Sequence, residues 1–467
     1  MLEGFLKIFL PLYIIIGACL PFARQLSVPS ETDLKLEDAM LNWSPQGREY
    51  VRLLSSNEEA FYYKLEMIRR AEDSIELSTF QFGTDEAGKL LISALMEAGQ
   101  RGVRVRLLID GVTGIDQAKN MAYFKVLSQC PNCEVKMYNP ISLRKPWSIN
   151  GRLHDKYLLV DDRLYTLGGR NIANSFLGLG ERPQKIDWDV LVIDVEDNKD
   201  RSAERLRAYF DHVWENEYAE TCTIRPKETR RRKYKKADET LRQIIKNFPG
   251  TGALADLMDE ALAQSVEVDR IALLVNPTTP YAKEPHVFYA MTWLMQQADE
   301  NVTFHTPYII MDQWMEEQLQ SIVDQVPDVT MLTNSIANTD NAFGAADYKK
   351  NKKNILKTGL HILEYDSGES YHGKCFVIDD KWSGIGAFNW DMRSTYIDTE
   401  TMLVIESEAF NAELREAMEV YDKRALLVVD EKTSIAPEGH KPLKPTLKIR
   451  FLMRFASFVN RFFRFLF

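Results

Sequence analysis

Cysteine is scarce in this chain of 467 residues, which contains only five. Two of them, Cys130 and Cys133, form a CPNC motif, and the sequence offers no second cysteine pair beside it. A structural zinc site usually takes four such ligands, so the motif does not favour zinc. The pair could form a small disulfide outside the cytoplasm, whereas inside it both thiols would stay reduced.

Two further classes of site are missing from the sequence. It contains no glycine-rich phosphate loop and no cluster of metal-ligating residues, so we expect neither a metal ion nor a cofactor. Basic residues are not in excess either, because 58 Lys and Arg stand against 68 Asp and Glu, a formal net charge of −10. Nucleic-acid-binding proteins usually carry a basic footprint, so we expect no nucleic-acid partner.

Long hydrophobic runs are also lacking, although the N-terminus differs from the rest of the chain. Lys7 precedes an apolar run of 13 residues, Ile8 to Leu20, which is short for a membrane span and typical of a signal-peptide core. The tetrapeptide ending at Cys19 resembles a bacterial lipobox. Residues 1–23 are therefore interpreted as a lipoprotein signal with a lipid anchor at Cys19, a cleaved signal, an uncleaved membrane anchor or a buried helix. Residues 24–43 are polar and predict a tether.

What the sequence does contain is one stretch that occurs twice. His154, Lys156 and Asp161 form an HxKxxxxD motif, and Asn171 follows. The same layout returns 218 residues later, because 372−154, 374−156, 379−161 and 389−171 all give that offset, as His372, Lys374, Asp379 and Asn389. A match in register over about twenty residues indicates an internal duplication.

These residue types suit the chemistry of a phosphodiester. The apolar runs inside each motif, YLLV and CFVI, predict buried strands, in which a histidine and a lysine two positions apart share a face. The lysine ammonium can neutralise phosphoryl oxygens, while one imidazole attacks phosphorus and the other protonates the leaving oxygen. Asp161 and Asp379 have odd spacing from their histidines. They are interpreted as structural or supporting members of the catalytic motif rather than as phosphate contacts.

A second acidic position follows each motif. The segments Ile186 to Ile193 and Ile397 to Ile405 align at an offset of 211, which pairs Asp189 with Glu400. An imidazole needs a partner on its second nitrogen to fix its tautomer. From spacing alone, structural and supporting roles for these two carboxylates remain equally open.

Strands alternate with helices in the same order before each motif, which predicts two α/β layered domains. The predicted domains are 44–220 and 247–430, joined by a basic linker at 221–246. In the first repeat the expected strands are 74–82, 103–110 and 134–140, with helices at 58–71 and 86–100. In the second, the expected strands are 301–310, 328–334 and 361–366, with helices at 287–298, 314–323 and 348–357.

Three basic segments are candidates for contact with a membrane surface. Residues 225–236 are interpreted as a solvated linker or as a contact for anionic lipid. In the segment 142–152, Arg144, Lys145 and Arg152 could meet lipid phosphates beside Trp147, unless the segment is a plain solvated loop. The tail 431–467 ends in a predicted helix with an arginine stripe and phenylalanine-rich faces. Such a helix suits an anionic bilayer, the alternative being packing on the protein's own core.

The paired motifs, together with the segments 102–110, 134–140 and 168–172, resemble the phospholipase D superfamily. Within it the chain is most similar to bacterial cardiolipin synthases of the subtype without two N-terminal membrane helices. The resemblance implies two tandem α-β-α domains that form a pseudo-dimer with one active-site cleft. It implies that His154 is the nucleophile and His372 the general acid, that Asn171 and Asn389 help hold phosphate, and that Asp189 and Glu400 partner the imidazoles.

The resemblance also implies an activity and a location. A phosphatidyl-histidine intermediate would pass its phosphatidyl group to a lipid hydroxyl such as that of phosphatidylglycerol, with phosphatidylethanolamine as a further substrate, at the bacterial cell membrane. The segment 386–389, GAFN, departs from many relatives that carry a serine there. Hydrolysis of phospholipid, cleavage of nucleic acid and a scaffold without catalysis are the alternatives.

Overall fold

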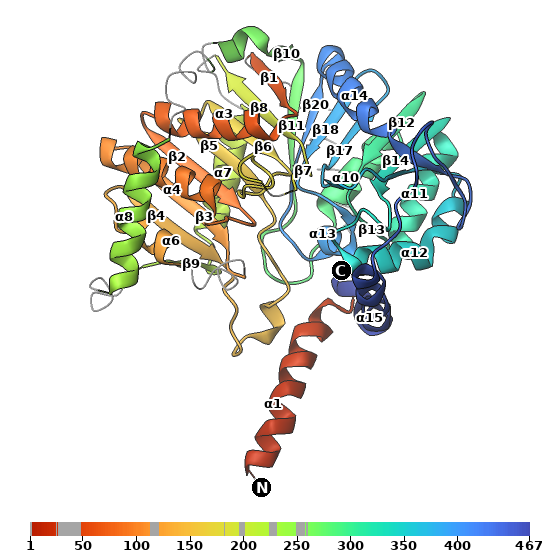
Figure 1. Cartoon of the computed structure of the whole chain (residues 1–467), viewed down its shortest axis with the longest axis horizontal. Helices are drawn as coiled ribbons and strands as arrows, with labels where there is room; N and C mark the ends of the chain where they lie inside the picture. Colours follow the sequence, from red (N-terminus) through yellow and green to blue (C-terminus); the bar gives the residue numbers. More distant parts are fainter. Residues whose placement is uncertain are drawn as a thin grey trace. The chain divides into compact units, whose positions relative to one another are not determined.

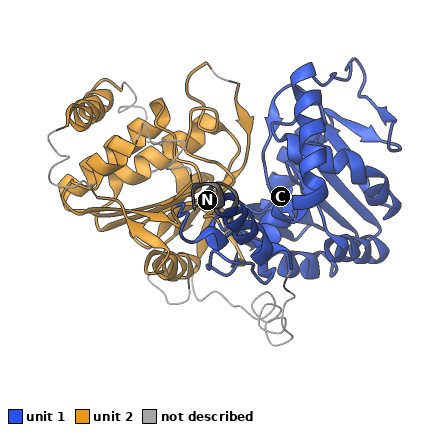
Figure 2. Cartoon of the chain, turned by 90° about the horizontal axis from the view of Figure 1, so that it is seen from below, with its two compact units in different colours: residues 1–43, 141–151, 274–467 blue, residues 44–140, 152–273 orange. Residues whose placement is uncertain are grey.

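The computed structural model describes residues 2–24, 26, 48–112, 121–181, 183–195, 201–223, 231–248, 257 and 260–467. The chain divides into two compact units, coloured in Figure 2. Unit 1 comprises residues 1–43, 141–151 and 274–467, and unit 2 comprises residues 44–140 and 152–273. The segment 141–151 therefore belongs with the second repeat, although it precedes the first motif in sequence.

Unit 2 is built on one sheet, whose order over the described residues is β10-β1-β8-β6-β5-β2-β3-β4-β9 (Figure 1). Its central strands β2, β3 and β4 are parallel, and β5 runs antiparallel to β2. The elements are β1 (Glu49–Leu54), α3 (Asn57–Arg70), β2 (Ser74–Thr79), α4 (Glu86–Arg101), β3 (Arg104–Asp110), α6 (Met121–Leu127), β4 (Cys133–Tyr138), β5 (Lys156–Val160), β6 (Leu164–Gly168), β7 (Lys185–Ile186), β8 (Asp189–Asp194), α7 (Ser202–Trp214), β9 (Ala219–Thr221), α8 (Arg232–Lys246) and β10 (Val266–Val268).

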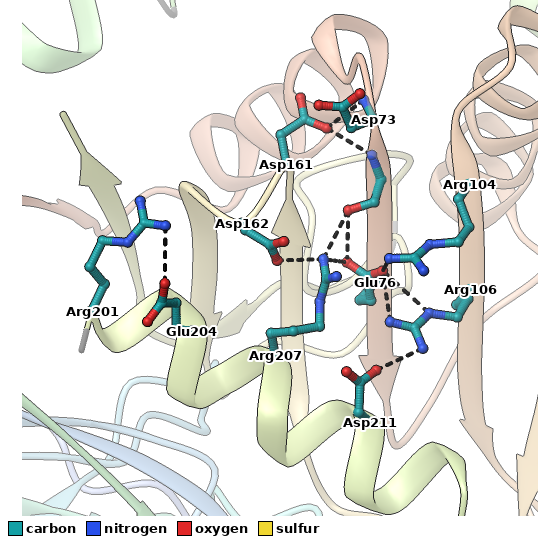
Figure 3. A network of polar contacts seen from close by, with 11 residues as sticks. Asp73, Glu76, Arg104, Arg106, Asp161, Asp162, Arg201, Glu204, Arg207 and Asp211 are labelled. Atoms are coloured by element: carbon teal, nitrogen blue, oxygen red, sulfur yellow. Dashed lines mark hydrogen bonds and ion pairs between the residues drawn. The ribbon is translucent and has the colours of Figure 1, made fainter. Parts of the chain in front are cut away.

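Helices cover both faces of this sheet because successive strand residues point to opposite sides. Ile75 and Leu77 of β2 are buried in the core cluster that includes residues of α3 and α4. Glu76, between them, points to the other face, where Arg106 of β3 and Arg207 of α7 bind its carboxylate (Figure 3). This fully buried carboxylate thus ties α7 to the sheet.

Unit 1 repeats the plan. Its sheet has the order β11-β20-β18-β17-β12-β14-β15-β21-β22 over the described residues, with β12, β14 and β15 parallel and β17 antiparallel to β12. The elements are β11 (Arg270–Val275, across the boundary), α10 (His286–Met295), β12 (Asn301–His305), β13 (Ile309–Ile310), α11 (Gln313–Gln325), β14 (Asp328–Asn334), α12 (Ala342–Lys357), β15 (His361–Tyr365), β16 (Ser370–Tyr371), β17 (Cys375–Ile378), β18 (Trp382–Gly386), β19 (Trp390–Asp391), α13 (Met392–Tyr396), β20 (Thr401–Glu406), α14 (Glu408–Asp422), β21 (Ala425–Val428), β22 (Ser434–Ile435) and α15 (Leu447–Phe463).

The predicted α/β class and the duplication are confirmed. Each expected strand and helix before the motifs is present, most within a few residues of its predicted bounds; the exceptions are 301–310, which splits into β12 and β13, and 348–357, whose helix α12 begins at Ala342. The two sheets place their strands in matching order, with the motif strand β5 or β17 beside the first parallel strand β2 or β12.

The predicted linker at 221–246 is corrected by the structure. Most of its described part, residues 231–246, forms the helix α8, which contacts α4 and α6 within unit 2. Tyr234, Ala237, Leu241 and Ile245 recur at helical spacing and are buried there, so the basic residues occupy only the outer face of a packed helix. Residues 224–230 lie outside the described residues.

The N-terminal run forms α1 (Leu2–Cys19), which continues through Pro11. Within the part of the chain that the structure describes, no helix is sufficiently long and apolar to cross a membrane. Apart from Arg24 and Leu26, the predicted tether at 24–43 lies outside the described residues.

Candidate active site

The first half-site lies where parallel strand β2 ends. The register pairs Thr79, the last residue of β2, with Lys156, the first residue of β5. His154 stands two residues before that strand, with its ring 5.2 Å from the ring of Phe80, edge to face. The Lys156 ammonium donates to the His154 carbonyl and lies 5.5 Å from the centre of the Phe80 ring. The His154 imidazole and the Lys156 ammonium therefore both lie beside the Phe80 ring.

The second half-site has the same construction in unit 1. His372 and Lys374 precede β17, next to the end of β12, and both are buried. The Lys374 Nζ lies 2.7 Å from His372 Nδ1 and 3.3 Å from Nε2, and it donates to the His372 carbonyl. The side chains lie together as their spacing predicts. The strand, however, begins only after each histidine, so the imidazoles sit on extended segments at the strand ends rather than inside the strands.

Two residues that the sequence reasoning missed hold these segments in place. Asp110 ends β3, and its Oδ2 accepts the backbone N–H of Leu153, the residue before His154, at 3.0 Å. Asn334 ends β14 and clamps Tyr371, the residue before His372. Its Oδ1 accepts from the Tyr371 N–H at 2.9 Å, and its Nδ2 donates to the Tyr371 carbonyl at 2.6 Å. Their matching position, last in the second parallel strand of each repeat, is the signal that could have identified them.

The two motif aspartates lie far from the imidazoles. Asp161 follows the last residue of β5, and seven residues at about 3.3 Å each place it about 23 Å along the chain from His154. Its carboxylate accepts the backbone N–H groups of Glu72, Asp73 and Ser74. Asp379 accepts those of Asp299, Glu300 and Asn301 in the same way. Both aspartates therefore hold backbone N–H groups of the neighbouring strand, and neither carboxylate is placed to contact the substrate phosphate.

Asp189 has a charged partner on α3. Its Oδ2 forms an ion pair with Lys64 of α3 at 2.5 Å, and its Oδ1 accepts from the Arg170 amide at 3.3 Å. The side chain of Asp189 therefore points from β8 toward α3, while its role toward an imidazole stays a prediction.

Glu400 belongs to a buried acidic group in unit 1. It is fully buried directly before β20. Burial raises the pKa of the nearby Asp391 to about 6, against the lowering effect of the Ser394 amide, and the charges of Glu400 and Asp398 raise it further. This places the Glu400 carboxylate beside the segment that follows the second motif, while its role toward an imidazole stays a prediction.

The two asparagines occupy related turns. Asn171 Oδ1 accepts from the backbone N–H of Gln81 at 3.2 Å, beside Phe80. The backbone N–H of Asn389 donates to the hydroxyl of Ser394 at 3.2 Å, and its Oδ1 is buried with no hydrogen-bond partner among the described residues. Ser394 thus brings a hydroxyl to the turn in which GAFN lacks one. The sequence reasoning did not identify it because it lies five residues beyond Asn389, outside the GAFN segment.

The described residues contain no group of three or more His, Cys, Asp or Glu side chains that could hold a metal ion. Cys130 and Cys133 are free thiols in the structure. Burial raises the pKa of Cys133 to about 12, so this thiol stays protonated and is a poor nucleophile.

Comparison with known proteins adds three kinds of likeness. A family described as "Cardiolipin synthase, PLD-like domain" matches residues 65–214 and 291–421. The chain is 29% identical to "Cardiolipin synthase C" of Escherichia coli (strain K12) over 396 residues, 76% of this chain and 81% of that protein. It is 25% identical to "Cardiolipin synthase 1" of Staphylococcus epidermidis (strain ATCC 12228 / FDA PCI 1200) over 392 residues, 81% and 71% of the two chains.

Among solved structures, phosphatidylserine synthase of Haemophilus influenzae Rd KW20 has a similar fold. It superimposes with a TM-score of 0.65 at 17% sequence identity, over 93% of this chain and 100% of that one.

Proposed function

The chain belongs to the cardiolipin synthase family with the PLD-like domain, and from this premise we propose that it is a phosphatidyltransferase that makes cardiolipin. The proposed reaction moves the phosphatidyl group of a donor phospholipid to a hydroxyl of phosphatidylglycerol. Donors are phosphatidylglycerol or phosphatidylethanolamine. The observation that carries the proposal is the pairing of a buried lysine with a histidine at the same strand end of both repeats.

In the proposed first step, one nitrogen of His154 attacks the phosphorus of the donor. A P–N bond forms, and the P–O bond to the headgroup alcohol breaks. His372 gives its proton to the leaving oxygen. The choice of His154 as nucleophile rests on the family resemblance.

In the second step the roles reverse. His372 takes the proton from the acceptor hydroxyl, whose oxygen attacks phosphorus and displaces His154. The products are cardiolipin and the regenerated imidazole pair. The same P–N intermediate would give phosphatidic acid if water attacked instead.

The lysines neutralise the phosphoryl oxygens in both proposed steps. Lys374 Nζ lies 2.7 Å from His372 Nδ1, so this ammonium can meet a phosphoryl oxygen beside the imidazole that transfers the proton.

The test is a vesicle assay with isotopically labelled phosphatidylglycerol and phosphatidylethanolamine, read by lipid mass spectrometry. We expect labelled cardiolipin from the wild-type protein and none from His154→Ala. Phosphatidic acid as the main product, with cardiolipin at background, would replace the transferase with a phospholipid hydrolase. Cleavage of DNA but not of lipid would reject both.

A further inference from the structure

Helix α15 has two faces of opposite character. One face packs on α12 through Met453 and Ala456, which are buried, with Ile449 partly buried beside them. The other face carries an exposed apolar stripe at spacings of four and three residues, which lie in line on a helix. The stripe consists of Leu447, Phe451, Phe455, Phe458 and Phe462, each between 57% and 82% exposed.

Basic side chains flank this outward stripe. Arg450, Arg454 and Arg461 are exposed and lie between the stripe and the packed face. From Lys441 to Phe467 the sequence has seven Lys or Arg and no Asp or Glu. Phenylalanines with arginines along one edge are the arrangement by which a helix lies in the interface of an anionic bilayer.

The outward direction of the stripe is fixed by contacts on the inward side. Arg464 forms an ion pair with Asp347 of α12 at 2.7 Å. Asn460 Nδ2 donates to the Phe343 carbonyl at 3.2 Å, and Phe467 stacks on the Phe343 ring at 4.5 Å. The phenylalanines of the stripe therefore cannot turn inward without breaking these contacts.

A second exposed segment of unit 1, residues 141–147, is connected to the C-terminal end of α15 through Arg393. Residues 141–147 expose Leu143 by 60% and Trp147 by 36%, next to the exposed Arg144 and Lys145. Arg393 links the residues just after this segment to the short 3-10 turn Arg464–Leu466 that follows α15. Its Nη1 donates to the Leu466 carbonyl at 3.2 Å, and its Nη2 donates to the Asn150 carbonyl at 2.5 Å.

Arg393 also connects these exposed segments to the second half-site. It precedes Ser394, whose hydroxyl accepts from the Asn389 amide. One residue thus lies between the two exposed apolar segments and the turn that follows the motif of His372.

We propose that the outward stripe of α15, together with residues 141–147, is the surface by which unit 1 docks on an anionic lipid bilayer. The phenylalanines enter the acyl region, and the arginines and Lys145 meet lipid phosphates. This deepens the proposed function, on which it rests, because it brings embedded lipid to the second half-site. A second copy of the chain fits the surface less well, since isologous pairing would set arginines against arginines.

The test compares three variants of the full chain on vesicles of phosphatidylglycerol and phosphatidylcholine. Phe451→Ser/Phe458→Ser/Phe462→Ser should weaken vesicle binding about tenfold or more. The matched control Val420→Ser/Leu427→Ser/Val429→Ser, at exposed apolar positions elsewhere in unit 1, should bind within about twofold of wild type. Arg450→Gln/Arg454→Gln/Arg461→Gln should remove much of the preference for phosphatidylglycerol and flatten the salt dependence. All should melt at the wild-type temperature.

A position-specific readout separates α15 from the N-terminal helix, which all variants share. Brominated lipid should quench the added fluorescence of Phe458→Trp. Wild-type binding by the triple serine variant, or absence of that quenching, overturns the docking surface whether or not cardiolipin is made. The docking surface is also overturned if analytical ultracentrifugation shows that the wild type is a dimer and the triple serine variant a monomer that still binds vesicles.

Activity distinguishes this failure from failure of the proposed function. The triple serine variant should retain transfer on monomeric short-chain phosphatidylglycerol and lose it on vesicles. If the wild type transfers on neither substrate, the proposed function fails, and vesicle binding alone still decides the docking surface.

Discussion

Asp161 and Asp379 close the same turn in the two repeats, and each carboxylate accepts three backbone N–H groups at 2.8 to 3.0 Å from the start of the neighbouring parallel strand. Both have positive φ, 51° and 45°, a backbone region that Asp and Asn tolerate better than most residues. The motif aspartate therefore joins the turn after the motif strand to the strand beside it, and it acts on the histidine only through the sheet.

The first prediction follows for Asp379→Asn. Asn tolerates the positive φ of this position as Asp does. Its side-chain NH2 group, however, must face one of the backbone N–H donors that the carboxylate now accepts. We therefore expect the free energy of unfolding to fall by about 1–3 kcal/mol. Activity per folded molecule should stay near wild type. Asp380→Asn, at an exposed position, is the control for thermal unfolding. An active-site role for Asp379 would instead show as lost activity at unchanged stability.

This loss should depend on pH. Burial alone would raise the pKa of Asp379, but the three N–H donors outweigh it and hold that pKa below its usual value. The carboxylate therefore contributes stability above about pH 4 that is lost as the pH falls through the lowered pKa. The gap between wild type and Asp379→Asn should narrow in acid. A gap that is constant from neutral pH to pH 3 would contradict the assignment.

Glu49 should show the opposite dependence. Burial raises its pKa to about 7, against the lowering effect of its bonds from Ser202. Between the unfolded pKa of about 4.3 and pH 7 the folded state holds a proton that the unfolded state has released. Its contribution to stability is therefore present at low pH and lost as the pH rises. Glu49→Gln should remove up to about 4 kcal/mol of this decline, seen as a flatter dependence of the melting temperature on pH.

Asn334→Asp tests the positioning of the second histidine. The substitution keeps the shape but sets a carboxylate against the carbonyls of Tyr371 and Pro307, which now accept from Nδ2. A displacement of the His372 segment by about 1 Å would lower kcat about 100-fold, with KM changed less. Asn354→Asp, exposed on α12, is the control. Equal losses in both variants would show a general charge effect instead.

The sequence predicted the parts of this protein that depend on local pattern. The apolar runs after His154 and His372, and the strand-helix alternation before them, specify the two sheets because periodicity and burial act over short stretches. Residues 231–246 were interpreted as a linker because of their basic residues. Their apolar residues, however, recur at helical spacing and are buried on α8: Tyr234, Ala237, Leu241 and Ile245. Only the packed structure shows that this spacing faces α4 and α6.

Partners in space were harder to predict than elements. Asp189 aligns with Glu400 in sequence, yet its partner Lys64 lies 125 residues away on a helix. Nothing in the local spacing of either residue records that pairing. Asn334 was missed for the same reason, because it binds Tyr371, 37 residues later in the sequence. Ser394 was missed although it lies only five residues after Asn389, because it stands outside the GAFN segment. Arg152, for which a lipid contact and a solvated loop were the two interpretations, is instead buried against Asp110 and the Asn139 carbonyl.

Metal independence is a further expected outcome. Two imidazoles and two lysines can supply attack, protonation and charge neutralisation, which are the tasks of a metal ion in other phosphodiester enzymes. Transfer measured on zwitterionic-rich vesicles should persist in EDTA. Loss of activity that a divalent ion restores, at unchanged vesicle binding, would refute this.

The assignment of His154 as nucleophile can be decided by separating the two steps of the reaction. A phosphatidyl ester with a nitrophenol leaving group needs little protonation, so His372→Ala should still form the P–N bond. Transfer of the phosphatidyl group to an acceptor hydroxyl, which breaks the P–N bond, however, needs His372 as base, so the adduct should accumulate. Mass spectrometry of peptides kept at neutral or alkaline pH should find an acid-labile phosphatidyl group on His154. His154→Ala should form none, and an adduct on His372 in that variant would reverse the two roles.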